Sequence, residues 1–334
     1  MLTFNHGAVN MLASGHAVVP LDMNILILGG NGFIGLELAF AFLKAGCKIA
    51  CIGRSNAQAK YRLPAAQWHD RDLSQLKTAN DWLPYLGGID VVVNCAGVLQ
   101  QGLRDKPFQT QHRAMAALYV AARQSGLRIV QISANTGGPA SGIAFLSTKK
   151  AADDLLKASG LAHTIIRPAL VVGRNAHGGT ALVRALAAMP WVIPLALRHS
   201  EIRTADMGDL CYLVLEAAHG SLGDAGDIVI ASADCQTLEQ AVLAHRAWLG
   251  LGPVRVVEVP ALISRLAGRL ADLTGWLGWR SPLRSTALKV LAGGVEGQQG
   301  LATRTSRSLR QTLAENPAGA PREHSQPLKI LSGV

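Results

Sequence analysis

Long uninterrupted apolar runs are missing from this 334-residue chain, although hydrophobic residues make up 49% of it. Because no stretch of about eighteen uncharged apolar residues occurs, we expect no transmembrane helix. The most apolar segment, residues 185–197, is short and is interrupted by Pro190 and Pro194. Residues 1–22 also lack the basic start and clean apolar core of a signal peptide. We therefore predict an N-terminal extension over residues 1–22, without an assigned function.

A cysteine framework is missing as well. The five cysteines are odd in number, scattered along the chain and without Cys-x-x-Cys spacing. This pattern argues against disulfide bonds and against a zinc site, and we expect no bound metal. Free thiols suit the reducing cytosol, so we predict a cytoplasmic protein.

Acidic residues are in deficit, because 32 Lys/Arg stand against 22 Asp/Glu and the formal charge is +10. The excess is uneven, since residues 264–334 hold ten Lys/Arg and four Asp/Glu. Positive charge of this kind is typical of proteins that bind nucleic acid or anionic membranes. No recognised nucleic-acid motif accompanies it, so we expect no nucleic-acid partner.

What the chain does contain, near its N-terminus, is a pattern of strand, turn, helix and strand. Residues 25–28 form a short continuous apolar run, as in a strand that is buried on both faces. A glycine-rich turn, residues 29–35, follows directly, and we then expect a helix over 36–44 and a strand over 48–52. This βαβ unit predicts an α/β fold with a Rossmann-type doubly wound parallel sheet.

The spacing of Gly29, Gly32 and Gly35 indicates a dinucleotide site within this turn. Early glycines let the turn tighten and the backbone approach a pyrophosphate, and the last glycine lets the helix pack close to the sheet. The backbone N–H groups of Phe33 and Ile34, at the start of the helix, are expected to face the phosphates. A purely structural glycine turn is the alternative, and the complete βαβ context favours the nucleotide.

Arg54 directly follows the second strand, where an NAD-preferring site would place an acidic residue against the ribose 2′-hydroxyl. A guanidinium at that position suits a 2′-phosphate, so we predict NADP as the cofactor, with NAD as the second choice. Arg54 as a solvated loop cation is the alternative. Asp72, after the third strand, is predicted to accept a hydrogen bond from the adenine amine, to cap the following helix, or both.

Small or polar residues end the later strands, and open α/β sheets bind their ligands at these ends. A buried strand over 90–97 contains Asn94 and ends in the small residues Ala96 and Gly97, where the backbone is expected to approach the cofactor. A strand over 127–133 has Ser133 at its C-terminal end, and a strand over 163–168 ends in Pro168. We predict that these residues border the nicotinamide end of the ligand.

With these pieces in place, the chain resembles the short-chain dehydrogenase/reductase superfamily, and in particular its extended and atypical branches. Within the superfamily it is most similar to NmrA-like proteins and to the Rossmann-type accessory subunit of respiratory complex I. The matching pieces cover roughly residues 24–260 and are the turn 29–35, Asp72 with Leu73, residues 94–97, Ser133, Thr148 with Lys149, Arg167 with Pro168, Val172 with Gly173, and Asp209 with Leu210.

The resemblance implies a chemistry built on Ser and Tyr-x-x-x-Lys. In that scheme the lysine lowers the pKa of the tyrosine, which exchanges a proton, and the serine orients the carbonyl. Ser133 and Lys149 match two of these roles, but the tyrosine position holds Phe145, whose ring carries no exchangeable proton. Lys149 would still be able to bind the nicotinamide ribose.

Three interpretations therefore remain open. The first is an NADPH-dependent oxidoreductase that acts on an unknown carbonyl compound or related small molecule, with Lys149 or water as the acid. The second is a non-catalytic NADP(H)-binding sensor or an assembly or accessory protein, as the resemblance implies. In the third, the site has degenerated and the fold serves as a scaffold.

The domain organisation follows from these assignments. We expect one NAD(P)-binding domain over residues 23–260, which includes a small C-terminal lobe with pocket candidates Arg174, Trp191 and Arg203. Residues 261–292 mix Trp and Leu with basic residues, which suits a peripheral membrane surface, an acidic protein partner or an ordinary packed amphipathic helix. Residues 293–334 are predicted to be a disordered tail with one short helix around 308–314.

Overall fold

The computed structural model describes residues 21–97, 108–136, 143–176, 178–260, 263 and 301–318, and two short strands before them. These strands, β1 (Asn10–Met11) and β2 (Ala17–Val18), pair antiparallel inside the predicted N-terminal extension. Apart from Ile263, the basic segment 261–292 lies outside the described residues, as does His177. Within the described part of the chain, no helix is both long and apolar enough to cross a membrane.

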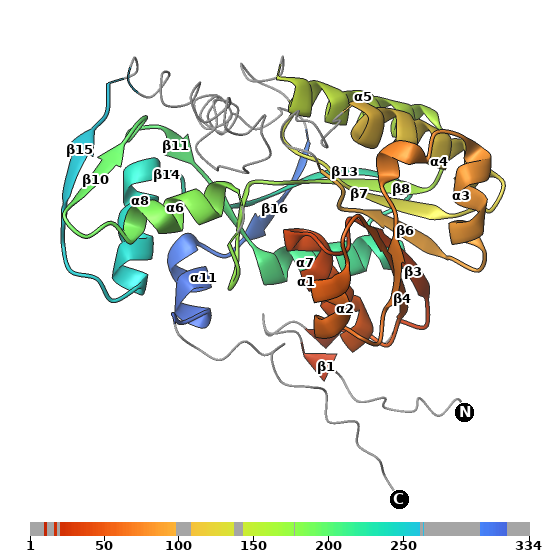
Figure 1. Ribbon diagram of the computed structural model, residues 1–334, viewed down its shortest axis with the longest axis horizontal. Helices are drawn as coiled ribbons and strands as arrows, with labels where there is room; N and C mark the ends of the chain where they lie inside the picture. Colours follow the sequence, from red (N-terminus) through yellow and green to blue (C-terminus); the bar gives the residue numbers. More distant parts are fainter. Residues whose placement is uncertain are drawn as a thin grey trace, which may run out of the picture.

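An eight-stranded parallel sheet forms the centre of the molecule, as Figure 1 shows. The order places the first strand of the βαβ unit near the middle, with later strands added on one side and the second and third strands on the other. From one edge to the other the strands are β16 (Ala302–Ser306), β13 (Ala225–Ser232), β8 (His163–Pro168), β7 (Arg128–Ile132), β6 (Val91–Asn94), β3 (Asn24–Leu28), β4 (Lys48–Gly53) and β5 (Gln67–Asp70). The predicted doubly wound sheet is confirmed.

Strand β3 shows why a continuous apolar run was needed. Ile25 and Ile27 point into the core on one face of the sheet, and Leu26 and Leu28 point into the core on the other. Each successive side chain of a strand changes face, so only an uninterrupted run fills both cores. The first face is covered by α1 (Phe33–Lys44), α2 (Ala57–Arg62) and α7 (Met207–His219), and the second by α3 (Ala79–Leu86), α4 (Ala114–Arg123) and α5 (Ala144–Ala158), with the short turns η1 (Leu73–Gln75) and η2 (Phe108–Arg113).

A smaller lobe, with its own apolar core, lies beside the sheet (Figure 1). In the described part of the chain, three two-stranded sheets and three helices build it. The strand pairs are β9 (Leu170–Val172) with β12 (Thr204–Asp206), β10 (Val192–Leu195) with β15 (Arg255–Glu258), and β11 (Glu201–Ile202) with β14 (Gln236–Thr237), and the helices are α6 (Gly179–Ala187), α8 (Leu238–Trp248) and α11 (Leu309–Glu315). The predicted small lobe is therefore present.

The C-terminal region corrects one expectation. Strand β13 joins the central sheet, where it pairs with β8. Residues 301–318, expected to be tail apart from one short helix, form edge strand β16 and helix α11. Arg307 holds this segment in place, because its guanidinium forms ion pairs with Asp206 and with Asp209, 2.9 Å away. The other residues of the predicted tail, 293–300 and 319–334, lie outside the described chain.

Candidate dinucleotide-binding site

The glycine turn after β3 is packed so closely that Gly29, Gly30 and Gly35 have little or no room for a side chain. Gly29 adopts a left-handed conformation (φ 73°), and a Cβ there would lie 3.1 Å from the Cα of Ala96. A Cβ on Gly35 would collide with the carbonyl oxygen of Gly29. The tight turn and the close helix therefore both require glycine, as the spacing predicted.

The start of α1 is open to a ligand on its backbone. Gly32 is the residue before the helix and, having no side chain, makes no side-chain cap to it. The first turn of α1 also carries no acidic residue that would repel phosphate. Uncapped N–H groups and the positive end of the helix dipole fit a pyrophosphate, so the turn passes the test for a dinucleotide.

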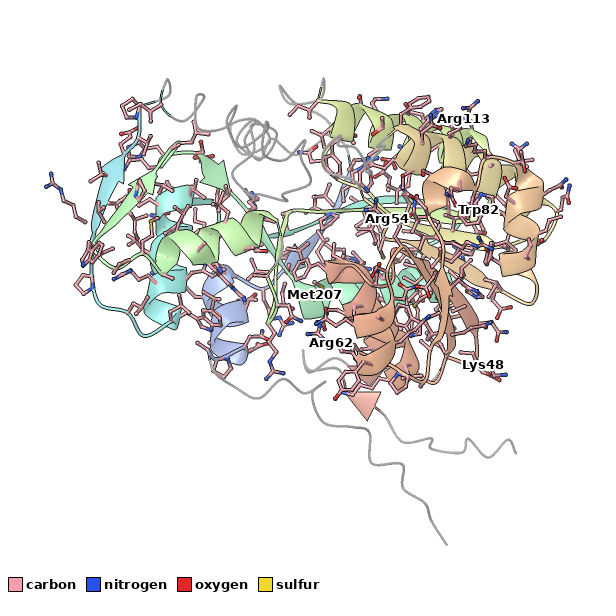
Figure 2. The ribbon with its side chains drawn as sticks, viewed as in Figure 1. Lys48, Arg54, Arg62, Trp82, Arg113 and Met207 are labelled. Carbon is pink, nitrogen blue, oxygen red and sulfur yellow. The ribbon has the colours of Figure 1, made fainter. Side chains whose placement is uncertain are left out.

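The adenosine end of the predicted site lies at the ends of β4 and β5. Arg54, which is labelled in Figure 2, is exposed in the bend directly after β4. Asn31 of the glycine turn reaches that bend, since its Nδ2 donates to the carbonyl of Ser55 at 2.8 Å. The glycine turn and the bend after β4 therefore lie side by side and form one rim of the predicted site. Asp72 accepts a hydrogen bond from the backbone N–H of Ser74 at 2.9 Å, so its capping role is confirmed, while its contact with adenine remains a prediction.

The loop after β6 lies against Lys149. Asn94 is buried, accepts a hydrogen bond from the N–H of Ala96 at 3.0 Å and donates to Oε1 of Gln131 at 2.7 Å. These bonds fix the backbone of the loop. A Cβ on Gly97 would lie 3.8 Å from Cε of Lys149, so the loop and α5 meet at the expected place.

Lys149 is buried beside the ring that replaces the superfamily's tyrosine. Its Nζ lies 5.8 Å from the centre of the Phe145 ring and donates a hydrogen bond to the carbonyl of Ile132 at 2.8 Å. Burial lowers the pKa of Lys149 below its ordinary value, against the opposite influence of the Asp153 carboxylate. The arrangement keeps the lysine but offers no phenol for proton exchange.

Ser133, at the end of β7, belongs to a buried ionic network. Its hydroxyl donates to Oδ2 of Asp153 at 2.6 Å, and Nη1 of Arg167 lies 2.9 Å from the same oxygen. Arg167 in turn makes two hydrogen bonds to the carboxylate of Asp227, of 2.8 and 3.1 Å. Burial raises the pKa of Asp153, and the neighbouring Arg167 opposes that shift. The hydroxyl proton of Ser133 is thus used in the hydrogen bond to Asp153. Pro168 directly follows Arg167 of this network.

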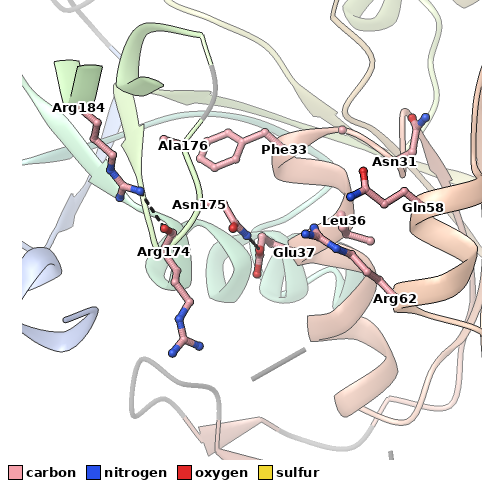
Figure 3. A pocket seen from close by; sticks show the side chains of 11 residues that line it. Asn31, Phe33, Leu36, Glu37, Gln58, Arg62, Arg174, Asn175, Ala176 and Arg184 are labelled. Atoms are coloured by element: carbon pink, nitrogen blue, oxygen red, sulfur yellow. Dashed lines mark hydrogen bonds between the residues drawn. The ribbon is translucent and has the colours of Figure 1, made fainter. Parts of the chain in front are cut away.

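A cavity of 540 Å³ opens between the glycine turn, α2 and the loop after β9, and Figure 3 shows it. Loop and helix are joined across it, since Nδ2 of Asn175 donates to Oε1 of Glu37 at 2.8 Å. The residues that line the cavity are Asn31, Gly32, Phe33, Leu36, Glu37, Gln58, Arg62, Arg174, Asn175, Ala176 and Arg184. Among the residues described, no group of three or more His, Cys, Asp and Glu side chains is arranged to hold a metal.

A family model described as NAD(P)H-binding matches residues 29–217, which is more than half of the chain. The chain belongs to the NAD(P)H-binding family. The match begins at the first glycine of the turn and ends in α7, so it spans both the turn and the Lys149 region. A search of curated protein sequences gives no match.

Solved structures with the same fold include sugar-nucleotide enzymes. The Bordetella bronchiseptica enzyme WbmH in complex with NAD+ is 18% identical, with a TM-score of 0.60 over 72% of this chain and 86% of that one. UDP-N-acetylglucosamine 4-epimerase from Bacillus cereus is 15% identical (TM-score 0.61; 88% and 98% covered). dTDP-glucose 4,6-dehydratase from Bacillus anthracis in complex with NAD is 16% identical (0.58; 88% and 96%).

The family model gives a nicotinamide dinucleotide as the ligand class of this NAD(P)H-binding protein, and the solved structures share its predicted Rossmann-type fold. The sequence did not indicate the cavity residues of α2, Gln58 and Arg62. The only available signal was the spacing of Gln58 and Arg62, which places them on one face of a helix. Glu37 and Arg184 were missed too, because only the fold brings α1 and α6 to one cavity.

Proposed function

We propose that the protein binds NADP(H), with the phosphates on the turn 29–35, the 2′-phosphate near Arg54, adenine near Asp72 and the nicotinamide ribose near Lys149. The observation that carries the choice of NADP over NAD is the charge at the end of β4. Arg54 is exposed there, and Asp70, which pairs in register with Gly53, has its carboxylate bound by Lys60 at 2.6 Å. The rim therefore presents positive charge, which favours a phosphate over a hydroxyl.

The nicotinamide end supports holding the cofactor better than it supports the superfamily's usual proton transfer. Phe145 has no proton to give, and the hydroxyl of Ser133 is donated to Asp153. The function that this geometry supports best is non-catalytic: an NADP(H)-binding sensor, or an accessory or assembly protein. The bound cofactor would undergo no reaction, and Lys149 would contact its ribose.

One observation favours a second candidate, an NADPH-dependent oxidoreductase that acts on an unknown carbonyl compound or related small molecule. Burial lowers the pKa of Lys149. An ammonium that releases its proton more easily is a better general acid, so Lys149 would protonate the product oxygen in place of the absent phenol. The two candidates share the binding site and differ only in turnover.

A titration of the purified protein with NADPH and NADH, followed by nicotinamide fluorescence, tests both. Binding of NADPH more tightly than NADH, without oxidation when a panel of aldehydes and ketones is added, supports the non-catalytic function. Steady oxidation with any panel member supports the oxidoreductase instead. Binding of neither nucleotide would overturn the proposal and leave the fold as a scaffold.

A further inference from the structure

The cavity beside the glycine turn is positively charged. Three arginines and one glutamate line it, and its other polar groups are the amides of Asn31, Gln58 and Asn175. Gly32 and Phe33, which belong to the phosphate-binding turn, are part of the same lining. The cavity therefore combines backbone of the phosphate-binding turn with more guanidinium groups than carboxylates. Such a lining attracts an anion.

Two of its charged groups are already used to hold the loop 173–176. Arg184, on α6, donates from Nη1 to the carbonyl of Arg174 at 2.8 Å and from Nη2 to the carbonyl of Gly173. Its guanidinium lies over the ring of Trp248, 4.6 Å from the ring centre. Glu37, the only carboxylate among the described residues of the lining, accepts the hydrogen bond from Asn175. Arg184 and Glu37 therefore fix the loop against the lobe and against α1.

The two other arginines come from opposite sides of the cavity. Arg62 is the last residue of α2, next to the Rossmann core, and Arg174 lies in the loop that follows β9 of the lobe. In Figure 3 the side chain of Arg62 extends from the α2 side towards α1, while Arg174 belongs to the loop on the far side. In this view Phe33, Leu36 and Glu37 of α1 lie between the two elements that carry them.

We infer that Arg62 and Arg174 form a clamp on the diphosphate of the dinucleotide, one arm from the Rossmann core and one from the lobe. This inference rests on the proposed function. The turn supplies backbone N–H groups to one side of the diphosphate, and the two guanidinium groups neutralise its charge from the cavity side. Arg184 acts as a positioning residue, because it sets the backbone of the loop that carries Arg174.

The clamp makes a prediction that separates it from the role of Arg54. The diphosphate is common to NADPH and NADH, whereas the 2′-phosphate occurs only in NADPH. Arg62→Gln and Arg174→Gln should therefore weaken both nucleotides by the same factor, about ten-fold for the loss of one charge-assisted contact. Arg54→Gln, by contrast, should weaken NADPH and leave NADH unchanged.

Calorimetric titration of the full chain with NADPH and with NADH tests this, in low and in high salt. Arg255→Gln, which removes an exposed arginine of β15 outside the cavity, is the matched control. Arg62→Lys should restore part of the affinity lost in Arg62→Gln, and the salt dependence of binding should be shallower in both Gln variants. Melting temperatures without nucleotide should match that of the wild-type protein, which excludes a loss of folding.

Unchanged affinities in Arg62→Gln and Arg174→Gln, in a wild-type protein that binds, would overturn the clamp alone and leave the proposed function intact. That outcome would also mean that the cavity serves a phosphate-bearing substrate or no ligand. A wild-type protein that binds neither nucleotide would overturn the proposed function as well. A loss confined to NADPH would show that these arginines read the 2′-phosphate, and it would refute the diphosphate assignment.

Discussion

Phe145 is the residue that separates binding from the superfamily's chemistry. Its ring centre lies 5.8 Å from Nζ of Lys149. A catalytic tyrosine would occupy the same position beside the lysine. The loop with Gly97 approaches Lys149 on α5, so a tyrosine at position 145 would place a phenol close to this ammonium. A single substitution should therefore create the electrostatic coupling on which the usual mechanism depends.

Replacing Phe145 by tyrosine should give a phenol whose pKa is lower when Lys149 is present than when it is absent. The nearby ammonium favours the phenolate, and Lys149→Met removes that charge while it keeps the apolar stem. NMR titration of ring-labelled tyrosine in Phe145→Tyr and in Phe145→Tyr/Lys149→Met measures the difference. Equal pKa values in the two variants would show that Lys149 does not act on this position.

Arg54 is the single residue that we expect to determine the preference for NADPH over NADH. Arg54→Asp places a carboxylate where the ribose 2′-oxygen is expected, so it should weaken NADPH by at least about ten-fold and strengthen NADH. Fluorescence titration gives both affinities, and Arg71→Asp, at the end of the neighbouring strand β5, is a comparison with the same charge change. An unaltered ratio of the two affinities in Arg54→Asp would remove Arg54 from the site.

The residues that sequence predicted correctly are those whose requirement is local. Gly29 and Gly35 are demanded by the turn itself, and Asp72 caps the next few residues of its own chain. The pairing of Ser133 with Asp153 and Arg167 was not predictable, because it joins three elements through the packed interior. The cavity residues depend on the placement of the lobe, which no pattern in the sequence fixes.

At the scale of elements, the βαβ unit follows from its apolar run, whereas β16 does not. Residues 302–306 read Ala-Thr-Arg-Thr-Ser, and four of the five are exposed at the edge of the sheet. An edge strand buries too little to show an apolar pattern, so its sequence resembles that of a loop. Its position is fixed instead by Arg307 and by Ser306, whose hydroxyl donates to Oδ2 of Asp209 at 2.9 Å.

Arg307→Met should destabilise the lobe, because it leaves the buried carboxylate of Asp206 without its counter-ion. Breaking such a pair costs about 3 kcal/mol of unfolding free energy. Burial raises the pKa of Asp206 and Arg307 opposes this, so loss of the arginine should raise that pKa further. A carboxyl that is protonated in the folded state carries no unpaired charge. The deficit in unfolding free energy of Arg307→Met, relative to the wild-type protein, should therefore shrink as pH falls from about 8 to about 5.

Denaturant unfolding at both pH values measures that deficit. Arg310→Met, an exposed arginine of α11, is the matched control and should cost little at either pH. A deficit in Arg307→Met that is equal at the two pH values would mean that Asp206 is not the group left unpaired. A deficit that grows on acidification would contradict the argument outright.

At the scale of the whole molecule, the charge of +10 is concentrated towards the C-terminus. Residues 261–292 hold Trp276 and Trp279 among five basic residues, and they directly follow the described part of the lobe. Basic side chains attract anionic headgroups, and tryptophan favours the interface between headgroups and hydrocarbon. We expect the full chain to bind vesicles that contain phosphatidylserine and to be released as salt is raised.

Sedimentation with such vesicles, and with neutral phosphatidylcholine vesicles, measures this binding. The variant Arg280→Gln/Arg284→Gln removes two charges close in sequence to the tryptophans. The control Arg255→Gln/Arg310→Gln removes two exposed charges elsewhere, so the two variants have the same net charge. Only the first should weaken binding, because local charge near the surface, rather than total charge, sets the attraction over a screening length of about 10 Å. Equal weakening in both variants would assign the attraction to the net charge, and a chain that stays in solution at low salt would exclude the membrane as its partner.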